Sequence, residues 1–284
     1  MILIADSGST KTDWRLLLPE GKIGQATTVG FNPNYQTAAA IEAELSERLL
    51  PQLGTNQPTQ IYFYGAGCST EAKCSLVAGA ILSVFPNSQV QVMSDVVAAA
   101  RGTCGHTAGI ACILGTGSNS CLYDGQSITA QMPCLGFTLG NEGSGSYLGK
   151  KLLNLYLNNE LPPDLQDAFR KQYPQSQAEI LHHIYNEPFP NRYVASFAQF
   201  LQGRQRHPFV AEMLHQNFLD FFRLTVCKYP DYQTLPTHFV GSIAYYFADI
   251  LRKTAKSLHI QVGRVLQSPI SGLALYHQEE AQNI

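Results

Sequence analysis

Two short glycine-rich segments, each directly after an apolar run, have the composition of turns that hold phosphate groups. Residues 6–12 read DSGSTKT, and residues 114–119 read LGTGSN. Small residues let the backbone come close to a phosphate, and consecutive N–H groups with hydroxyls can hold its oxygens. One such turn could be an ordinary hairpin, in which Gly, Ser and Asp are common. Two of them predict a nucleotide phosphate chain held from two sides.

The carboxylate of Asp6 ends its apolar run, where it could hold a hydrated Mg²⁺, and Lys11 or Thr12 could meet the nucleotide phosphates. This segment is not a P-loop, because the G-x-x-x-x-G-K-[ST] spacing is absent and a strand is expected where a helix should follow. Phosphoryl transfer depends mostly on positioning and charge neutralisation, which backbone amides and Mg²⁺ supply. A nucleoside triphosphate and Mg²⁺ are therefore expected, and the family resemblance described below implies that the nucleotide is ATP.

Asp95 is a carboxylate at the expected junction of a strand and a helix, where it could take part in catalysis. It follows the apolar run 90–93 and precedes a predicted helix over 96–101, so its carboxylate could also be a simple N-cap. The two roles are compatible, and a helix N-terminus is expected to lower the pKa of Asp95 and keep it ionised at neutral pH. Glu142, the nearest competing carboxylate, is expected to cap or brace a helix over 143–158.

The composition excludes several classes of partner. The 284 residues are 45% hydrophobic and only 14% charged, with a net charge of −2 and no long run of either sign. Such a chain can bury a large core, and it offers no electrostatic basis for capturing nucleic acid or an anionic membrane. Its apolar runs fall short of the roughly 18–20 residues of a membrane span. The start, MILIAD, predicts a first strand of a cytoplasmic protein rather than a signal peptide.

The elements that must position these residues alternate between strands and helices. Strand–turn–strand patterns open the chain at 2–18 and recur at 110–131, which predicts two lobes with similar starts, covering 1–104 and 105–269. A C-terminal helix over 270–284 is expected to complete the first lobe. Helical periodicity over 37–50 is expected to end at Pro51, and a single helix is expected over 243–258. The class is therefore α/β, with mixed sheets covered by helices.

The segments together resemble the superfamily of actin, heat-shock chaperone ATPases and sugar kinases. Residues 6–12 resemble its first phosphate loop, residues 114–119 its second, and residues 240–244 (VGSIA) its adenosine-binding turn. More narrowly, the chain is similar to the family that joins N-acetylglucosamine kinases to the activator ATPases of benzoyl-CoA reductase. The narrower match rests on GFNPN at 30–34, SD at 94–95, GNEGS at 140–144 and QSPISGL at 267–273. The resemblance implies two ribonuclease-H-like lobes with an interlobe cleft.

The resemblance also implies roles for single residues. Asp6 would orient Mg²⁺, and Asp95 would take the proton of the attacking hydroxyl. The residues implied to bind the nucleotide are Asp6, Gly8, Thr10, Lys11, Thr12, Gly115, Thr116, Gly117, Gly241 and Ser242. The residues implied to bind the sugar are Asn32, Asp95, Ser118, Asn119 and Asn141. In this family the position of Asn141 is usually Asp, so the acceptor sugar stays open.

The leading function is ATP-dependent phosphorylation of a sugar, at the 6-hydroxyl of N-acetylglucosamine or a related amino sugar. The alternative is an ATPase that activates an electron-transfer partner through an iron–sulfur cluster. Cys68 and Cys74 are the closest pair of the seven cysteines, and no second ligand set matches them. A filament-forming or chaperone-like binder is the third class, and the chain is short for it. A small-molecule sugar partner is expected, and a homodimer is compatible with the sequence.

Overall fold

The computed structural model describes residues 1–8 and 10–282. Ser9, inside the first predicted phosphate loop, and the last two residues of the helix predicted over 270–284 lie outside them. The chain divides into two compact units. Unit 1 comprises Met1–Thr107, Gly125–Ile128 and Ser268–Ile284, and unit 2 comprises Ala108–Asp124 and Thr129–Gln267. Within the described part of the chain, no helix combines the length and apolar character needed to cross a bilayer.

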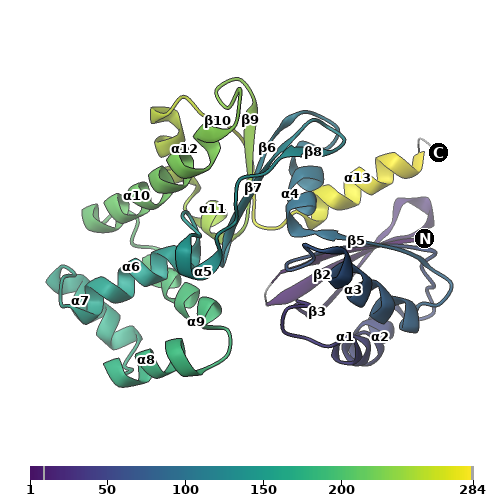
Figure 1. The fold of residues 1–284 in the computed structure, drawn as a ribbon, viewed down its shortest axis with the longest axis horizontal. Helices are drawn as coiled ribbons and strands as arrows, with labels where there is room; N and C mark the ends of the chain where they lie inside the picture. The colour runs from purple at the N-terminus through teal and green to yellow at the C-terminus, as the bar shows by residue number, and fades with distance from the viewer. Residues whose placement is uncertain (9, 283–284) are drawn as a thin grey trace. The chain divides into compact units, whose positions relative to one another are not determined.

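Unit 1 is built on a five-stranded mixed sheet in the order β3-β2-β1-β4-β5 (Figure 1). Its strands are β1 (Ile2–Ser7), β2 (Lys11–Leu17), β3 (Ile23–Val29), β4 (Gln60–Gly65) and β5 (Gln89–Ser94). β1 pairs antiparallel with β2 and parallel with β4, and β4 pairs parallel with β5. Three neighbouring strands therefore end at one edge of the sheet.

Helices cover both faces of this sheet, because the strands bury side chains on both sides. The helices of unit 1 are α1 (Ala38–Glu44), α2 (Leu50–Leu53), α3 (Glu71–Val84), α4 (Asp95–Cys104) and α13 (Ile270–Gln282). Leu3 and Ala5 of β1 pack in the core that contains Ile41 of α1 and Ile81 of α3. Ile4, which points to the other face, packs in a second core with α4 and α13.

Unit 2 repeats the same sheet. Its strand order is β10-β9-β6-β7-β8. Read in reverse, this is the order of unit 1, with β6, β7, β8, β9 and β10 in the places of β1, β2, β3, β4 and β5. The strands are β6 (Gly109–Leu114), β7 (Ser118–Tyr123), β8 (Ile128–Ala130), β9 (Pro236–Val240) and β10 (Gln261–Leu266). β6 pairs antiparallel with β7 and parallel with β9, and β9 pairs parallel with β10. This shared topology is the two-lobed α/β fold of actin-like kinases.

The helical part of unit 2 lies mostly between β8 and β9. Its helices are α5 (Gly136–Leu139), α6 (Gly145–Leu157), α7 (Pro163–Gln172), α8 (Gln177–Asn186), α9 (Pro190–Ser196) and α10 (Pro208–Leu224), followed by α11 (Ser242–Tyr246) and α12 (Ala248–Ser257). Short 3₁₀ segments span Pro19–Gly21, Phe197–Leu201 and Val226–Lys228. α6 and α10 pack with β6 in one large core, which includes Leu114, Leu148 and Phe221.

Two predicted helix boundaries are wrong. Pro51 does not end the helix that begins at Ala38: a wide π-type turn (Leu45–Leu49) follows α1, and Pro51 lies inside α2. In that turn the N–H of Leu50 bonds to the carbonyl of Leu45, so the regular ladder that Pro51 would break is already interrupted. The helix predicted over 243–258 is also broken, at Phe247, whose φ of −112° and ψ of 25° leave the helical region while its ring is buried.

Candidate functional site

The first cluster of predicted site residues lies where β1, β4 and β5 end in unit 1. The register pairs Ser7 with Gly65 and Gly65 with Ser94, so the residues beside these positions lie along one edge. Asp6 is the last residue but one of β1, and Asp95 directly follows β5. The carboxyl ends of parallel strands commonly bind ligands in α/β sheets. The fold thus brings together two carboxylates that are 89 positions apart in the sequence.

The carboxyl group of Asp6 is the more perturbed of the two. Burial raises its pKa to about 7, and the nearby carboxylates of Asp13 and Asp95 act in the same direction. Two interactions oppose this shift: a hydrogen bond from the Ser268 hydroxyl, at 2.9 Å from Oδ2, and the charge of Lys11. All of these side chains belong to unit 1. The carboxylate of Asp6 offers oxygen atoms alone as ligands, which is the kind of ligand that a hard divalent cation takes.

Asp95 is the first residue of α4 and not its N-cap, which is Ser94. Burial raises the pKa of Asp95 to about 6, whereas hydrogen bonds from the backbone N–H groups of Val96 and Asp95 lower it. The expectation of a net lowering by the helix N-terminus was therefore wrong in sign, because desolvation outweighs the hydrogen bonds. A pKa of about 6 still leaves the carboxyl mostly ionised at neutral pH.

Asn32 is held at the same end of unit 1 by its neighbours. The hydroxyl of Ser7 accepts a hydrogen bond from the N–H of Phe31 at 2.9 Å, which ties the loop to β1. Asn32 is buried, and its Oδ1 accepts the N–H of Asn34 at 3.0 Å. A side chain at Gly67 would approach this oxygen to 2.4 Å, so the loop after β4 needs glycine there. The amide nitrogen of Asn32 is the part of the side chain that remains for a ligand.

The first glycine-rich loop is a tight hairpin between β1 and β2. The N–H of Gly8 donates to the carbonyl of Lys11 at 3.0 Å, and Gly8 and Thr10 are exposed. Lys11 pairs with Asp13 at 2.9 Å on the surface. Thr12 is fully buried, and its hydroxyl bonds to Ser7 at 2.8 Å and to the carbonyl of Val29 at 2.9 Å. The hydroxyl of Thr12 therefore supports the hairpin from inside the sheet.

The second glycine-rich loop, in unit 2, rests on the first turn of α6. The N–H of Gly145 donates to the carbonyl of Gly115 at 2.8 Å, and the N–H of Ser146 donates to the carbonyl of Thr116 at 3.1 Å. The turn itself is closed by a bond from the Gly115 N–H to the Gly117 carbonyl at 3.0 Å. A methyl group on Gly115 would meet no atom within 4 Å. The backbone of this loop is therefore fixed in position and open on the side of Gly115.

Gly241 joins β9 to α11, which begins at Ser242, and both residues lie next to this loop. Gly241 has a φ of +114°, and a side chain there would approach the carbonyl oxygen of Leu114 to 2.4 Å. Its N–H donates to the carbonyl of Leu266 at 3.0 Å. Ser242 is exposed and is the first residue of α11. Only glycine fits this position, so the predicted adenosine-binding turn packs directly on the second glycine-rich loop.

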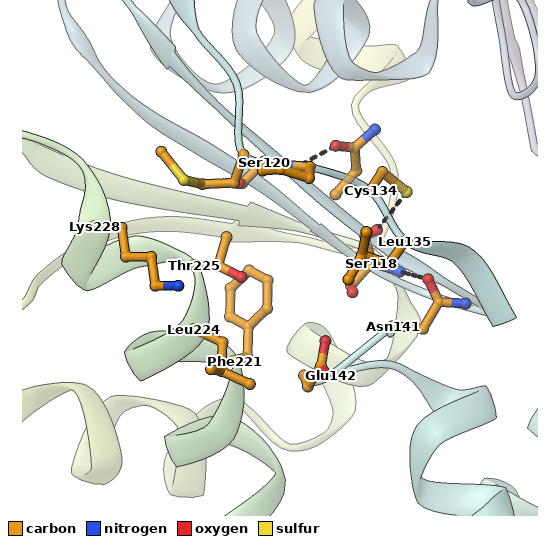
Figure 2. A pocket seen from close by; sticks show the side chains of 13 residues that line it. Ser118, Ser120, Cys134, Leu135, Asn141, Glu142, Phe221, Leu224, Thr225 and Lys228 are labelled. Carbon is orange, nitrogen blue, oxygen red and sulfur yellow. Dashed lines mark hydrogen bonds between the residues drawn. The ribbon is translucent and has the colours of Figure 1, made fainter. Parts of the chain in front are cut away.

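Three of the predicted sugar-binding residues, Ser118, Asn119 and Asn141, line one cavity of about 190 Å³ within unit 2 (Figure 2). Figure 2 shows Ser118, Asn141 and Glu142 on one side of the cavity, with Thr225 and Lys228 opposite. The remaining lining residues are Ser120, Met132, Pro133, Cys134, Leu135, Phe221 and Leu224. A cavity with hydroxyl and amide groups beside apolar side chains suits a small polar ligand.

Two side chains have roles that the sequence did not indicate. Glu142 was expected to cap or brace helix α6, but Ser144 is the N-cap and accepts the N–H of Tyr147 at 3.2 Å, while Glu142 lines the cavity. Ser268 was not among the predicted site residues, although it hydrogen-bonds to Asp6. Its only signal was its place in the familial segment 267–273. Among residues 1–8 and 10–282, no group of three His, Cys, Asp or Glu side chains could hold a metal ion.

No protein-family model matches the chain, and no curated protein matches it. Its fold is similar to that of a candidate N-acetylglucosamine kinase from Porphyromonas gingivalis, with a TM-score of 0.94. The two sequences are 41% identical, and the match covers 99% of this chain and 100% of that one.

More distant structures share the fold alone. A candidate N-acetylglucosamine kinase from Chromobacterium violaceum is 20% identical, with a TM-score of 0.76 over 97% of this chain and 98% of that one. A ROK family glucokinase from Streptomyces griseus, in complex with glucose and AMPPNP, is 16% identical, with a TM-score of 0.57 over 96% of each chain.

Proposed function

The chain belongs to the actin-fold sugar-kinase family that contains the Porphyromonas candidate N-acetylglucosamine kinase, and on this premise we propose that it phosphorylates an amino sugar with ATP. The likeness along 99% of the chain at 41% identity is the observation that carries the proposal. The acceptor atom that we propose is the 6-hydroxyl oxygen of N-acetylglucosamine or a related N-acetylhexosamine. ATP as the donor is consistent with a reaction in the cytoplasm.

Asp95 is the proposed general base. Its carboxylate takes the proton of the attacking hydroxyl as the new O–P bond forms and the bond to the leaving ADP breaks. A base works best when its pKa is close to the working pH without exceeding it, and burial raises the pKa of Asp95 to about 6. The same carboxylate accepts backbone N–H groups at the start of α4, which fixes its direction.

Asp6 is the proposed metal ligand. Burial is the main reason why its pKa is raised to about 7, the charges of Asp13 and Asp95 add to the shift, and a bound cation would oppose both. Mg²⁺ supplies neutralisation of the charge that develops on the phosphate oxygens. Asp6 would hold the cation at the end of β1, where Ser268 orients Oδ2 of Asp6 through the 2.9 Å hydrogen bond.

The glycine-rich loops are the proposed phosphate contacts of each unit. Gly8 and Thr10 are exposed at the first hairpin, and Gly115, Thr116 and Gly117 form the second. Backbone N–H groups in such turns bind phosphate without the mobility of long side chains. Gly241 and Ser242 are the proposed neighbours of the adenosine, and Ser118, Asn119 and Asn141 the proposed sugar contacts in unit 2, with Asn32 in unit 1.

The test is ADP release by the purified full chain with ATP and Mg²⁺, against hexoses, N-acetylhexosamines and muramic acid derivatives. N-Acetylglucosamine or a related amino sugar is expected to raise the rate well above the rate in water. If no sugar does so, the kinase proposal fails and the activator ATPase remains. Iron analysis of the same preparation separates that alternative, because an activator would carry an iron–sulfur cluster.

A further inference from the structure

The side chain of Asn141 is occupied by the protein at both of its ends. Its Oδ1 accepts the N–H of Ser118 at 3.4 Å, and its Nδ2 donates to Oγ of Ser146 at 3.3 Å. Its backbone has a φ of +67°, which asparagine tolerates better than most residues. A Cβ atom added at Gly117 would lie 3.3 Å from the amide group of Asn141. Asn141 therefore links the second glycine-rich loop to the first turn of α6.

The side chain of the next residue, Glu142, is not engaged by the protein in this way. Its side chain is half-buried at the cavity wall, and it makes no hydrogen bond or ion pair with any of the described residues. The groups that feel its charge are Tyr147 and Lys150. The ammonium of Lys150 does not neutralise it directly, because it donates to the carbonyl of Phe137 at 2.6 Å. Tyr147 donates its hydroxyl to Asp220 at 2.9 Å.

A carboxylate at a cavity wall that accepts no hydrogen bond from the described residues is available to accept hydrogen bonds from a ligand. The helix that Glu142 precedes does not supply a hydrogen-bond donor, since Ser144 caps it. The cavity does have room for a partner, because its volume is about 190 Å³ and a single water molecule needs only about 10–15 Å³ of such space. Among the described lining residues, Glu142 carries the only carboxylate.

We propose that Glu142 determines the acceptor specificity of this kinase by accepting hydrogen bonds from two adjacent hydroxyl groups of the sugar. This inference rests on the proposed function. A carboxylate only accepts hydrogen bonds, and its two oxygens can take one O–H each from a vicinal diol. Bonds to a charged acceptor are roughly twice as strong as neutral ones. The ligand class is therefore an amino sugar with a free vicinal diol, held by Glu142 beside Ser118 and Asn119.

The variants for the test are Glu142→Gln and Glu142→Ala in the full chain. Glu160→Gln is the matched control, because it removes the same charge from an exposed site just beyond the C-terminal end of α6. The ligands are N-acetylglucosamine and its 3-deoxy and 4-deoxy analogues. Steady-state ADP release and calorimetric titration with the sugar are both measured, together with thermal melting.

Glu142→Gln is expected to raise KM and Kd for the sugar about tenfold to a hundredfold, the effect of weakening one or two bonds to a charged acceptor. The KM for ATP is expected to stay constant, as is every parameter of Glu160→Gln. At least one deoxy analogue should bind much more weakly than the parent sugar to wild type, but about equally to Glu142→Ala. Melting temperatures should not fall, because the carboxylate has no hydrogen-bond or ion-pair partner among the described residues to lose.

Three outcomes separate the possibilities. An unchanged KM and Kd in Glu142→Gln, with a lower melting temperature, would make Glu142 a bracing residue and overturn the inference while the kinase proposal stands. If the sugar binds in a way that depends on Glu142 but is not phosphorylated, the proposed function is overturned and the inference about Glu142 stands. Wild type that neither binds nor phosphorylates the sugar would overturn both.

Discussion

The hydroxyl of Ser268 donates a hydrogen bond to Oδ2 of Asp6 at 2.9 Å, although the two residues lie at opposite ends of the chain. Ser268 also accepts the N–H of Ile270 at 3.3 Å, so the same hydroxyl starts α13. The segment that enters the last helix therefore controls the acidity of a residue on the first strand. The bond lowers the pKa of Asp6 against the larger effect of burial, which raises it.

Ser268→Ala should move the acid limb of the activity profile to higher pH. Without the hydroxyl, the pKa of Asp6 rises further above about 7, so a larger fraction of the enzyme is protonated at the proposed metal ligand at neutral pH. We expect kcat/KM to fall severalfold at pH 7 and to recover at pH 8.5. The measurement is a pH profile at two Mg²⁺ concentrations. Equal profiles for wild type and variant would contradict the coupling.

Asp6→Asn should abolish activity and yet stabilise the protein at alkaline pH. The folded-state pKa of Asp6 is raised from 3.8 to about 7, so its stabilising contribution is complete below pH 3.8 and is lost as the pH rises through about 7. Asparagine removes the buried charge. At pH 8, without nucleotide or metal, we expect a melting temperature about 2–4 °C higher, the shift that about 1 kcal/mol gives in a chain of this size. At pH 5 the difference should shrink, and a constant difference would argue against the raised pKa.

Asp95→Asn should leave ATP binding intact and lower kcat by roughly 10²–10⁴, the usual contribution of a general base. Asparagine can still accept the backbone N–H groups at the start of α4, so the fold should persist. In wild type, kcat should fall as the pH drops through about 6, because protonated Asp95 cannot take the hydroxyl proton. Nucleotide affinity from calorimetry serves as the control. A kcat equal to that of wild type would leave Asp95 with a structural role only.

Gly115→Ala and Gly241→Ala should separate phosphate binding from stability. A methyl group at Gly115 meets no protein atom within 4 Å, so the fold should tolerate it while the approach of a phosphate is blocked. We expect a KM for ATP at least tenfold higher with an unchanged melting temperature. At Gly241 the methyl group would collide with the carbonyl of Leu114 at a φ of +114°, so we expect a loss of at least about 2–3 kcal/mol of stability. An unchanged KM for ATP in Gly115→Ala would remove that loop from the nucleotide site.

Asn141→Asp should distinguish neutral from acidic acceptor sugars. Aspartate keeps the acceptor for the Ser118 N–H but loses the donor to Ser146, and it adds a second negative charge beside Glu142. We expect a lower KM for N-acetylglucosamine and a higher KM for any carboxylate-bearing sugar that the enzyme accepts. The comparison is made across one panel of neutral and acidic amino sugars. Equal KM values throughout would show that residue 141 only braces the loop.

Local sequence patterns determined most of the elements of this protein. The strand–turn–strand openings were predicted at both 2–18 and 110–131 and are present, and Thr70, a residue type that favours N-caps, caps α3. The aromatic set at helical spacing in α10, Phe218, Phe221 and Phe222, is buried as core. These features depend on residues within a few positions of one another, because hydrophobic period, turn chemistry and capping all act over one or two turns of chain.

The tertiary structure decided what the site residues can do. The pKa of Asp95 rises instead of falling, because its burial in the folded protein outweighs the backbone hydrogen bonds at the start of α4. Ser268 joins Asp6 only when α13 folds back onto the first sheet. Asn141 and Glu142 are neighbours in the sequence, yet contacts with Ser118 and Ser146 engage the one and leave the other facing the cavity. The burial of a side chain, the charges near it and its hydrogen-bond partners all depend on residues that are close in space but distant in the sequence. A local pattern of residues therefore cannot predict them.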